Sequence, residues 1–291
     1  MAPQSSENMI RFALPKGRMY EGVATLMGDA GISIQTSSRD YRPSISLPGF
    51  DVKVLKPRAI IEMLELGARD LGFAGADWVA EDSAELVELL DTGLDRVRLV
   101  AAVPVMSNED ELLNRSGAVV ASEYVNITKR WIKEKGYNAR LIRSYGATEV
   151  LPPEDADCII DNTATGSTLD ANNLRIIDEL MISTTRIYAS KIAMENTEKR
   201  VQIERFVLLV QSVLEARKRV MLEMNVSIND LESVIEVLPC MRQPTVAPMH
   251  NSDGFAVKVA VLRKQLAEII PMIKARGGSD IIVTQPGQIV P

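Results

Sequence analysis

The chain has 291 residues, which suits two or three domains, and its hydrophobic fraction of 46% is enough for substantial cores. Its net charge of −6 argues against a partner held by phosphate neutralisation, so we expect no nucleic-acid partner. Two cysteines, Cys158 and Cys240, and one histidine, His250, make neither a disulfide framework nor a metal-ligand cluster, and we expect both thiols to be buried and reduced. We find no membrane-length apolar run and no signal-peptide pattern, so we expect no membrane contact and a cytoplasmic protein.

The N-terminal third alternates predicted strands with predicted helices, which is typical of an α/β fold. The first strand, residues 9–14, runs into Pro15-Lys16-Gly17-Arg18 and a helix over 19–30. This order places two cations at the carboxyl edge of the sheet, where open α/β sheets bind ligands. Taken alone, Lys16 and Arg18 are more simply explained as solvated surface cations.

Three further charged residues follow predicted strands or begin predicted helices. Arg58 begins a helix after the strand 52–55, and Asp77 follows the strand 71–75. Glu149 lies in a segment that follows a strand over 139–142 and ends at Pro152-Pro153. Each could face a cleft, but Arg58 could equally be solvated, Asp77 could cap a helix, and Glu149 could be favoured by a helix dipole.

Long apolar segments in the middle of the chain predict connections between two lobes. We interpret residues 97–105 as a strand that crosses from the first lobe to the second. The second lobe then holds a strand over 117–121 and a helix over 124–135. Strands over 174–183 and 186–190 are expected to lead back, and 196–218 is a long amphipathic helix.

The segment CIIDNTATGSTLDANNL, residues 158–174, combines a strand end, a hydroxyl-rich loop and the first turns of a helix at 169–174. Helix N-termini offer unpaired N–H groups and a favourable dipole, so this arrangement suits a phosphate. Gly166 permits close backbone approach. Ordinary capping by Ser and Thr is the alternative, and the loop is neither a Walker loop nor a Rossmann fingerprint.

The run D-x-x-x-T-G-x-T-L-x-x-N-x-L, from Asp161 to Leu174, resembles the signature of ATP phosphoribosyltransferase, the enzyme of the first step of histidine biosynthesis. The PKGR run, the segment LGFAGAD and the segment GATE are similar to further motifs of that family. The resemblance covers nearly the whole chain.

This resemblance implies a role for each matching residue. The loop would hold the 5-phosphate of phosphoribosyl pyrophosphate through Thr163, Ala164, Thr165, Gly166, Ser167, Thr168 and Leu169. Asp161 would lie near the ribose hydroxyls or magnesium, while Lys16 and Arg18 would neutralise phosphates. The implied cofactor is magnesium, held mainly through substrate phosphates, and the implied partners are ATP and phosphoribosyl pyrophosphate.

The tail, residues 219–291, has the predicted order βαββαβ of a ferredoxin-like module. Its strands are expected at 219–225, 244–248, 255–261 and 280–284, and its helices at 229–238 and 264–275. The segments RQPTVAP and GGSDIIV resemble the regulatory, ACT-like domain of the long form of the family, which binds histidine as an inhibitor. Position alone suggests Glu223, Asn225, Thr245 and Ser279 for that site, and each could be a plain surface polar group.

We therefore expect an α/β protein with a two-lobed, periplasmic-binding-protein-like catalytic part and a regulatory tail. Lobe I would comprise residues 1–105 and 185–218, lobe II residues 106–184, and the regulatory domain residues 219–291. The resemblance also implies a homo-oligomer, a dimer or hexamer.

Three other functions fit parts of the pattern. A cytoplasmic amino-acid-binding receptor or regulator would share the lobes and the sensor tail, but the PKGR and TGST runs indicate phosphate. A prephenate dehydratase would combine similar parts, yet we find no motif of that family. A type I phosphoribosyltransferase has paired acidic residues before its loop, whereas Asn162 follows Asp161 here.

Overall fold

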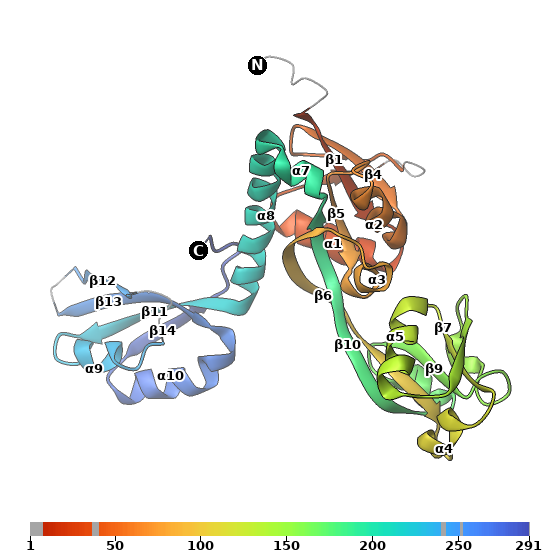
Figure 1. The fold of residues 1–291 in the computed structure, drawn as a ribbon. Coiled ribbons are helices and arrows are strands. Elements are labelled where there is room, and N and C mark those ends of the chain that lie inside the picture. Colours follow the sequence, from red (N-terminus) through yellow and green to blue (C-terminus); the bar gives the residue numbers. More distant parts are fainter. Residues whose placement is uncertain (1–7, 37–40, 240–242, 251–252, 291) are drawn as a thin grey trace. The chain divides into compact units, whose positions relative to one another are not determined.

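The structure is a computed structural model that describes residues 8–36, 41–239, 243–250 and 253–290 (Figure 1). The chain divides into two compact units, one of residues 1–25 and 32–207 and one of residues 26–31 and 208–291. Cys158 is buried and free, as expected, whereas Cys240 lies outside the described residues.

The first unit contains one eight-stranded mixed sheet with the order β4-β1-β5-β10-β6-β9-β7-β8. Three parallel strands form one side, three parallel strands form the other, and the antiparallel pair of β6 and β10 joins them. Two lobes thus share one sheet, which confirms the α/β, two-lobed fold class.

The elements of the first lobe and the crossing pair alternate along the chain. They are β1 (Ile10–Pro15), α1 (Arg18–Asp29), β2 (Ile34–Gln35), β3 (Ser44–Ile45), β4 (Phe50–Leu55), α2 (Pro57–Glu65), β5 (Leu71–Gly75), α3 (Ala76–Asp82), β6 (Val87–Pro104) and β10 (Leu174–Ala189).

The second lobe lies between β6 and β10 in the sequence. Each of its three strands is followed by a loop and a helical segment. Its elements are α4 (Glu109–Asn114), β7 (Ala118–Ser122), α5 (Val125–Lys135), β8 (Ala139–Arg143), the 3₁₀ turn η2 (Thr148–Val150), β9 (Cys158–Thr163) and α6 (Ser167–Ala171). After β10 come α7 (Lys191–Glu195) and α8 (Thr197–Lys218).

The second unit contains a four-stranded antiparallel sheet with the order β12-β13-β11-β14. Its elements are β11 (Arg219–Ser227), α9 (Leu231–Ile235), β12 (Thr245–Pro248), β13 (Gly254–Leu262), the 3₁₀ turn η3 (Arg263–Gln265), α10 (Leu266–Ala275) and β14 (Ser279–Thr284). Numbered within the module, the sheet runs 2-3-1-4, which confirms the ferredoxin-like order.

Several predicted boundaries are wrong. The two strands expected at 174–183 and 186–190 are one strand, β10, whose register with β6 shifts at bulges around Ser183–Arg186. β6 begins at Val87, ten residues before the predicted start, because polar residues and Gly93 interrupt the apolar pattern in the segment before Val97. The helix expected at 169–174 is the five-residue α6, and Asn173 at φ 55° turns the chain into β10.

Other helices are shorter or divided. The segment before Pro152 forms only the turn η2, and α4 was not predicted. The helix expected at 229–238 is shorter in the structure and forms α9. The helix expected at 264–275 is divided into the turn η3 and the helix α10.

Aromatic packing fixes α8 on the sheet of the first unit. The Phe206 ring lies 5.1 Å from that of Phe12 and 6.3 Å from that of Phe73, measured between centroids. All three side chains are fully buried. Such ring pairs add about 0.5–1.5 kcal/mol each beyond their area burial, so the start of α8 belongs to the core of this unit.

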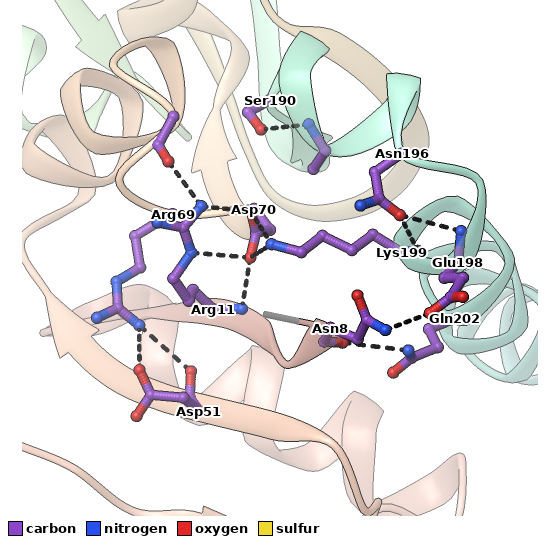
Figure 2. A network of polar contacts seen from close by, with 12 residues as sticks. Asn8, Arg11, Asp51, Arg69, Asp70, Ser190, Asn196, Glu198, Lys199 and Gln202 are labelled. Carbon is purple, nitrogen blue, oxygen red and sulfur yellow. Dashed lines mark hydrogen bonds and ion pairs between the residues drawn. The ribbon is translucent and has the colours of Figure 1, made fainter. Parts of the chain in front are cut away.

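A buried ion cluster around Asp70 ties the same helix to the amino ends of β1 and β5 (Figure 2). Asp70 is 1% exposed and accepts from Arg11 through the backbone N–H at 2.8 Å, Nε at 3.0 Å and Nη2 at 2.7 Å. Lys199 Nζ donates to the same carboxylate at 3.0 Å. Burial alone would raise the pKa of Asp70, but the hydrogen bonds from Arg11 and Lys199 outweigh it and hold the pKa below its usual range.

We expect Asp70→Asn to destabilise the protein by about 3 kcal/mol, because it leaves Arg11 and the nearly buried Lys199 without their anion. The lowered pKa means that this stability is present above about pH 4 and is lost as the pH falls. Urea unfolding measures the change. Glu85→Gln, which breaks the exposed Lys191–Glu85 pair, is the control and should cost far less, because solvent screens that pair. Equal losses in the two variants would contradict the assignment.

Candidate functional site

Every candidate of the catalytic unit follows the carboxyl end of a parallel strand. Lys16 and Arg18 follow β1, Arg58 follows β4, and Asp77 follows β5. In the other lobe, Glu149 follows β8, and Asp161 to Leu169 end β9 and enter α6. Ligands of open α/β sheets bind at such carboxyl ends, so the topology gathers these residues at the edge where a ligand is expected.

A small hollow of about 130 Å³ lies at this edge between the two lobes. Two predicted residues, Arg18 and Asp77, line it together with Asn162 of β9. Arg18 is exposed, and no partner of its guanidinium is found among the described residues, so it is available to an anion. The hollow also includes Trp78, Asp95, Ser183, Thr184 and Thr185.

Asp77 is the centre of a hydrogen-bond network that crosses from one lobe to the other. Its buried carboxylate accepts from Tyr124 Oη at 2.6 Å and from Ser183 Oγ at 2.7 Å. Asn162 Nδ2 in turn donates to Tyr124 Oη at 2.9 Å. Burial and the neighbouring carboxylate of Asp77 raise the pKa of Tyr124 far above its usual range, so its hydroxyl stays a donor. Asp77 therefore does more than begin α3.

Arg58 and Lys16 have partners outside the phosphate loop. Arg58 forms a two-point ion pair with Asp82, at 2.7 and 3.2 Å, and its guanidinium lies over the Trp78 ring at 5.1 Å from the centroid. Lys16 Nζ donates to Tyr41 Oη at 3.0 Å. The structure thus gives Arg58 a packing role beside the hollow and leaves Lys16 exposed next to Tyr41.

The predicted phosphate loop closes on itself through short hydrogen bonds. Thr163 Oγ1 accepts from the backbone N–H of Gly166 at 3.0 Å, and the hydroxyls of Thr165 and Ser167 lie 2.9 Å apart. Gly166 has φ 91°, in the region that favours glycine. Ala164, Thr165, Ser167 and Thr168 are exposed, whereas Leu169 packs into the core with Val100, Ile159 and Leu174. Leu169 thus anchors the loop to the sheet through its side chain.

Asp161 has an unusual ionisation. Burial raises its pKa to about 6, a backbone hydrogen bond from Asn162 opposes this, and the carboxylates of Glu149 and Glu123 add to the rise. A half-buried carboxylate with neighbours of its own sign is typical of functional sites. A cation at this position would relieve the repulsion.

Several contributors to this region were not predicted from the sequence, among them Glu123, Tyr124, Asn162, Ser183 and Asp95. Glu123 and Tyr124 directly follow β7, so the rule that ligands bind at carboxyl ends of strands identifies them once β7 is assigned. Ser183 lies within a long strand and carries no such signal, since only the pairing of β10 with β5 brings it to Asp77.

In the second unit, a hollow of about 310 Å³ opens on the sheet face. Glu223, Asn225 and Thr245 line it, together with Lys258, whose Nζ lies 2.7 Å from the Glu223 carboxylate. Ser279 stands beside it and donates to the backbone oxygen of Asn225 at 3.2 Å. The four residues suggested from position thus come from one neighbourhood of the sheet.

In the parts of the chain that the structure describes, no three His, Cys, Asp or Glu side chains are grouped to hold a metal ion. Across these same ranges, no helix combines the length and apolar character needed to cross a membrane.

Comparison with known proteins gives the same family at both ends of the chain. The family model "ATP phosphoribosyltransferase" matches residues 56–212, and the model "HisG, C-terminal domain" matches residues 216–285. The curated ATP phosphoribosyltransferase of Pelotomaculum thermopropionicum is 37% identical over 287 residues, which cover 97% of this chain and 99% of that protein. The enzyme of Chlorobium phaeobacteroides is 35% identical over 280 residues, with 94% and 95% covered.

A solved structure agrees with this. The ATP phosphoribosyl transferase (HisG:HisZ) complex from Thermotoga maritima aligns with 71% of this chain and 99% of its own chain, at 27% identity and a TM-score of 0.63. The fold, with its candidate site at the carboxyl ends of the parallel strands, is that of a two-lobed α/β enzyme. The chain belongs to the ATP phosphoribosyltransferase family, the pentosyl transferases of the first step of histidine biosynthesis.

We expect Asp161→Asn to stabilise the protein by about 1–2 kcal/mol near pH 8, because it removes a half-buried charge from two carboxylate neighbours. The folded-state pKa of about 6 lies above the ordinary value, so the cost is complete above that pH and absent below about pH 4. Urea unfolding at both pH values measures it, with the exposed Asp170→Asn as control. A gain that is the same at both pH values would contradict the assignment.

Proposed function

We propose that this chain transfers the phosphoribosyl group of phosphoribosyl pyrophosphate to N1 of ATP and releases pyrophosphate. The observation that carries the proposal is the hydroxyl-rich loop 163–169, with Gly166 at φ 91°, at the carboxyl end of β9 in a chain of this family. In this proposal the exposed hydroxyls and N–H groups of the loop bind the 5-phosphate of the sugar.

The proposed reaction does not depend on a strong general acid or base of the protein. Adenine N1 has a free lone pair at neutral pH, so the nucleophile needs no deprotonation. Catalysis then comes from holding the two substrates in line and from stabilising charge on the leaving pyrophosphate. Arg18, which is exposed and has no partner among the described residues, is suited to that charge, and Lys16 would support it.

Magnesium is part of the proposal through the substrate. In this proposal the ion would be bound mainly by the pyrophosphate and by water, as is usual for magnesium in phosphate-transferring sites. Asp161 would be the protein carboxylate nearest to it: burial is the main cause of its raised pKa, and the neighbouring carboxylates of Glu149 and Glu123 add negative charge that a cation would offset. When bound, the ion would neutralise the pyrophosphate.

The tail supports feedback inhibition by histidine. The C-terminal family model matches residues 216–285, and the Thermotoga chain aligns with only 71% of this chain, as expected if this is the long form. The hollow in the second unit pairs a cation, Lys258, with the carboxylate of Glu223. These opposite charges suit the carboxylate and ammonium groups of an amino acid.

The three-part division of the chain, the homo-oligomer and the cytoplasmic location stay predictions.

We expect Gly166→Val to remove activity by raising the KM for phosphoribosyl pyrophosphate at least about 100-fold. A Cβ at this position meets no atom within 4 Å, so the damage is confined to a strained backbone and a blocked approach to the loop. Steady-state kinetics and thermal melting measure the two effects.

Gly117→Val is the matched control, because Gly117 also has positive φ, at 81°, and open space around a Cβ. It should lose similar stability and keep its KM. If both variants behaved alike in kinetics, the loop would not be the phosphate site.

We also expect Glu223→Gln to weaken histidine binding at least about 10-fold, because a charge-assisted hydrogen bond to the ammonium group is lost. Isothermal titration calorimetry with histidine measures this. Glu236→Gln, which breaks an exposed pair with Arg276 in the same unit, should leave the affinity unchanged. Unchanged affinity in Glu223→Gln would exclude this hollow as the histidine site.

A further inference from the structure

The strand β6 carries a bulge opposite β10 next to the hollow between the lobes. Leu94 pairs with Thr185, whereas Asp91 pairs with Arg186, so Thr92 and Gly93 have no partner in the ladder. Gly93 at φ 68° and Asp95 at φ 49° both lie in the left-handed region. Bulges re-aim side chains and occur often beside active sites.

Side chains on both strands hold this bulge in place. Thr92 Oγ1 donates to the backbone oxygen of Thr185 at 2.5 Å, and Asp91 Oδ1 accepts from Thr184 Oγ1 at 2.7 Å. Thr185 Oγ1 donates to Asp95 Oδ2 at 2.7 Å. A non-glycine residue at positive φ costs free energy and persists where its surroundings over-determine it. The carboxylate of Asp95 is thus fixed before any ligand arrives.

Asp95 lines the hollow that also contains Arg18 and Asn162. Its Oδ2 is used by Thr185, while no partner of Oδ1 is found within the described ranges. A carboxylate oxygen is an acceptor only, so Oδ1 offers a hydrogen-bond acceptor to a donor group of a ligand in the hollow. Arg18 in the same hollow favours an anion, so the ligand that fits carries both an N–H donor and phosphate.

We propose that Asp95 accepts a hydrogen bond from the 6-amino group of the purine and selects adenine nucleotides over purines that lack this group. This inference rests on the proposed function, in which ATP is the nucleophilic substrate. A carboxylate could also take magnesium, but the proposed function assigns that ion to the substrate pyrophosphate near Asp161 and leaves Asp95 to the base.

The reaction itself strengthens such a contact. When N1 gives its lone pair to the ribose carbon, the bond from that carbon to the pyrophosphate oxygen breaks and its electron pair leaves with pyrophosphate. The positive charge left on the base spreads over N1 and the 6-amino nitrogen. A carboxylate bound to the 6-amino N–H therefore binds the transition state more strongly than the substrate. Asp95 thus acts as a specificity-determining residue that also favours the reacting base.

The test compares ATP with purine riboside 5′-triphosphate, which keeps the N1 lone pair and lacks only the 6-amino group. We expect the unaltered chain to prefer ATP by about 10- to 100-fold in kcat/KM, the range of a hydrogen bond to a charged group. Asp95→Gly accepts φ 49° without strain and should reduce this preference to less than about threefold. Asp95→Asn keeps an acceptor oxygen and should retain part of it.

Asp110→Asn, an exposed change on α4, is the control for the loss of one negative charge. If Asp95→Gly kept the full preference for ATP, the proposal would be overturned. An equal fall of kcat/KM for both nucleotides would count as such a result and would assign Asp95 to the bulge alone. Equal use of both nucleotides by the unaltered chain would also overturn it. If no product formed from ATP at all, the proposed function would fail, and calorimetric binding of the two nucleotides to the same variants would still decide the role of Asp95.

Discussion

The antiparallel pairing of β6 with β10 is the constraint on which the rest of the first unit depends. These two strands of 18 and 16 residues join three parallel strands on one side to three on the other (Figure 1). The strands of each parallel group have their carboxyl ends at one edge of that group. The pair of β6 and β10 brings these two edges together at the hollow between the lobes. The bulges between Ser183 and Arg186 then turn polar side chains of both long strands into the hollow between the lobes.

Contacts between α3 and α5 set how the lobes meet at that hollow. Besides the bonds of Asp77, the buried carboxylate of Glu81 accepts from the backbone N–H groups of Asn126 at 2.9 Å and Ile127 at 2.9 Å. Glu81 thereby satisfies unpaired donors at the start of α5, a capping role played by a residue of the other lobe. A single short helix, α3, thus holds the neighbouring lobe through two carboxylates.

The fold class, the tail topology and the family could be predicted from the sequence, because they depend on local pattern and on motif residues such as those from Asp161 to Leu174. Predicted strands such as 71–75 and 52–55 were close to β5 and β4, since short segments with regularly placed apolar residues are strong strand signals. The start of β6 and the continuity of β10 could not be predicted in this way. Polar residues such as Asp91 and Thr184 interrupt the pattern there, and only their pairing across the sheet keeps the strands intact. For the same reason Asp95 and Ser183 were missing from the predicted site: their importance follows from long-range pairing and not from neighbours in the chain.

We infer that the edge shared by the two lobes transfers phosphoribosyl groups to ATP. The most direct test mixes the purified chain with ATP, phosphoribosyl pyrophosphate and magnesium and follows the ultraviolet absorbance of the modified adenine, with and without histidine. We expect product that requires both substrates and falls when histidine is added. Folded protein that binds neither substrate and forms no product would contradict it.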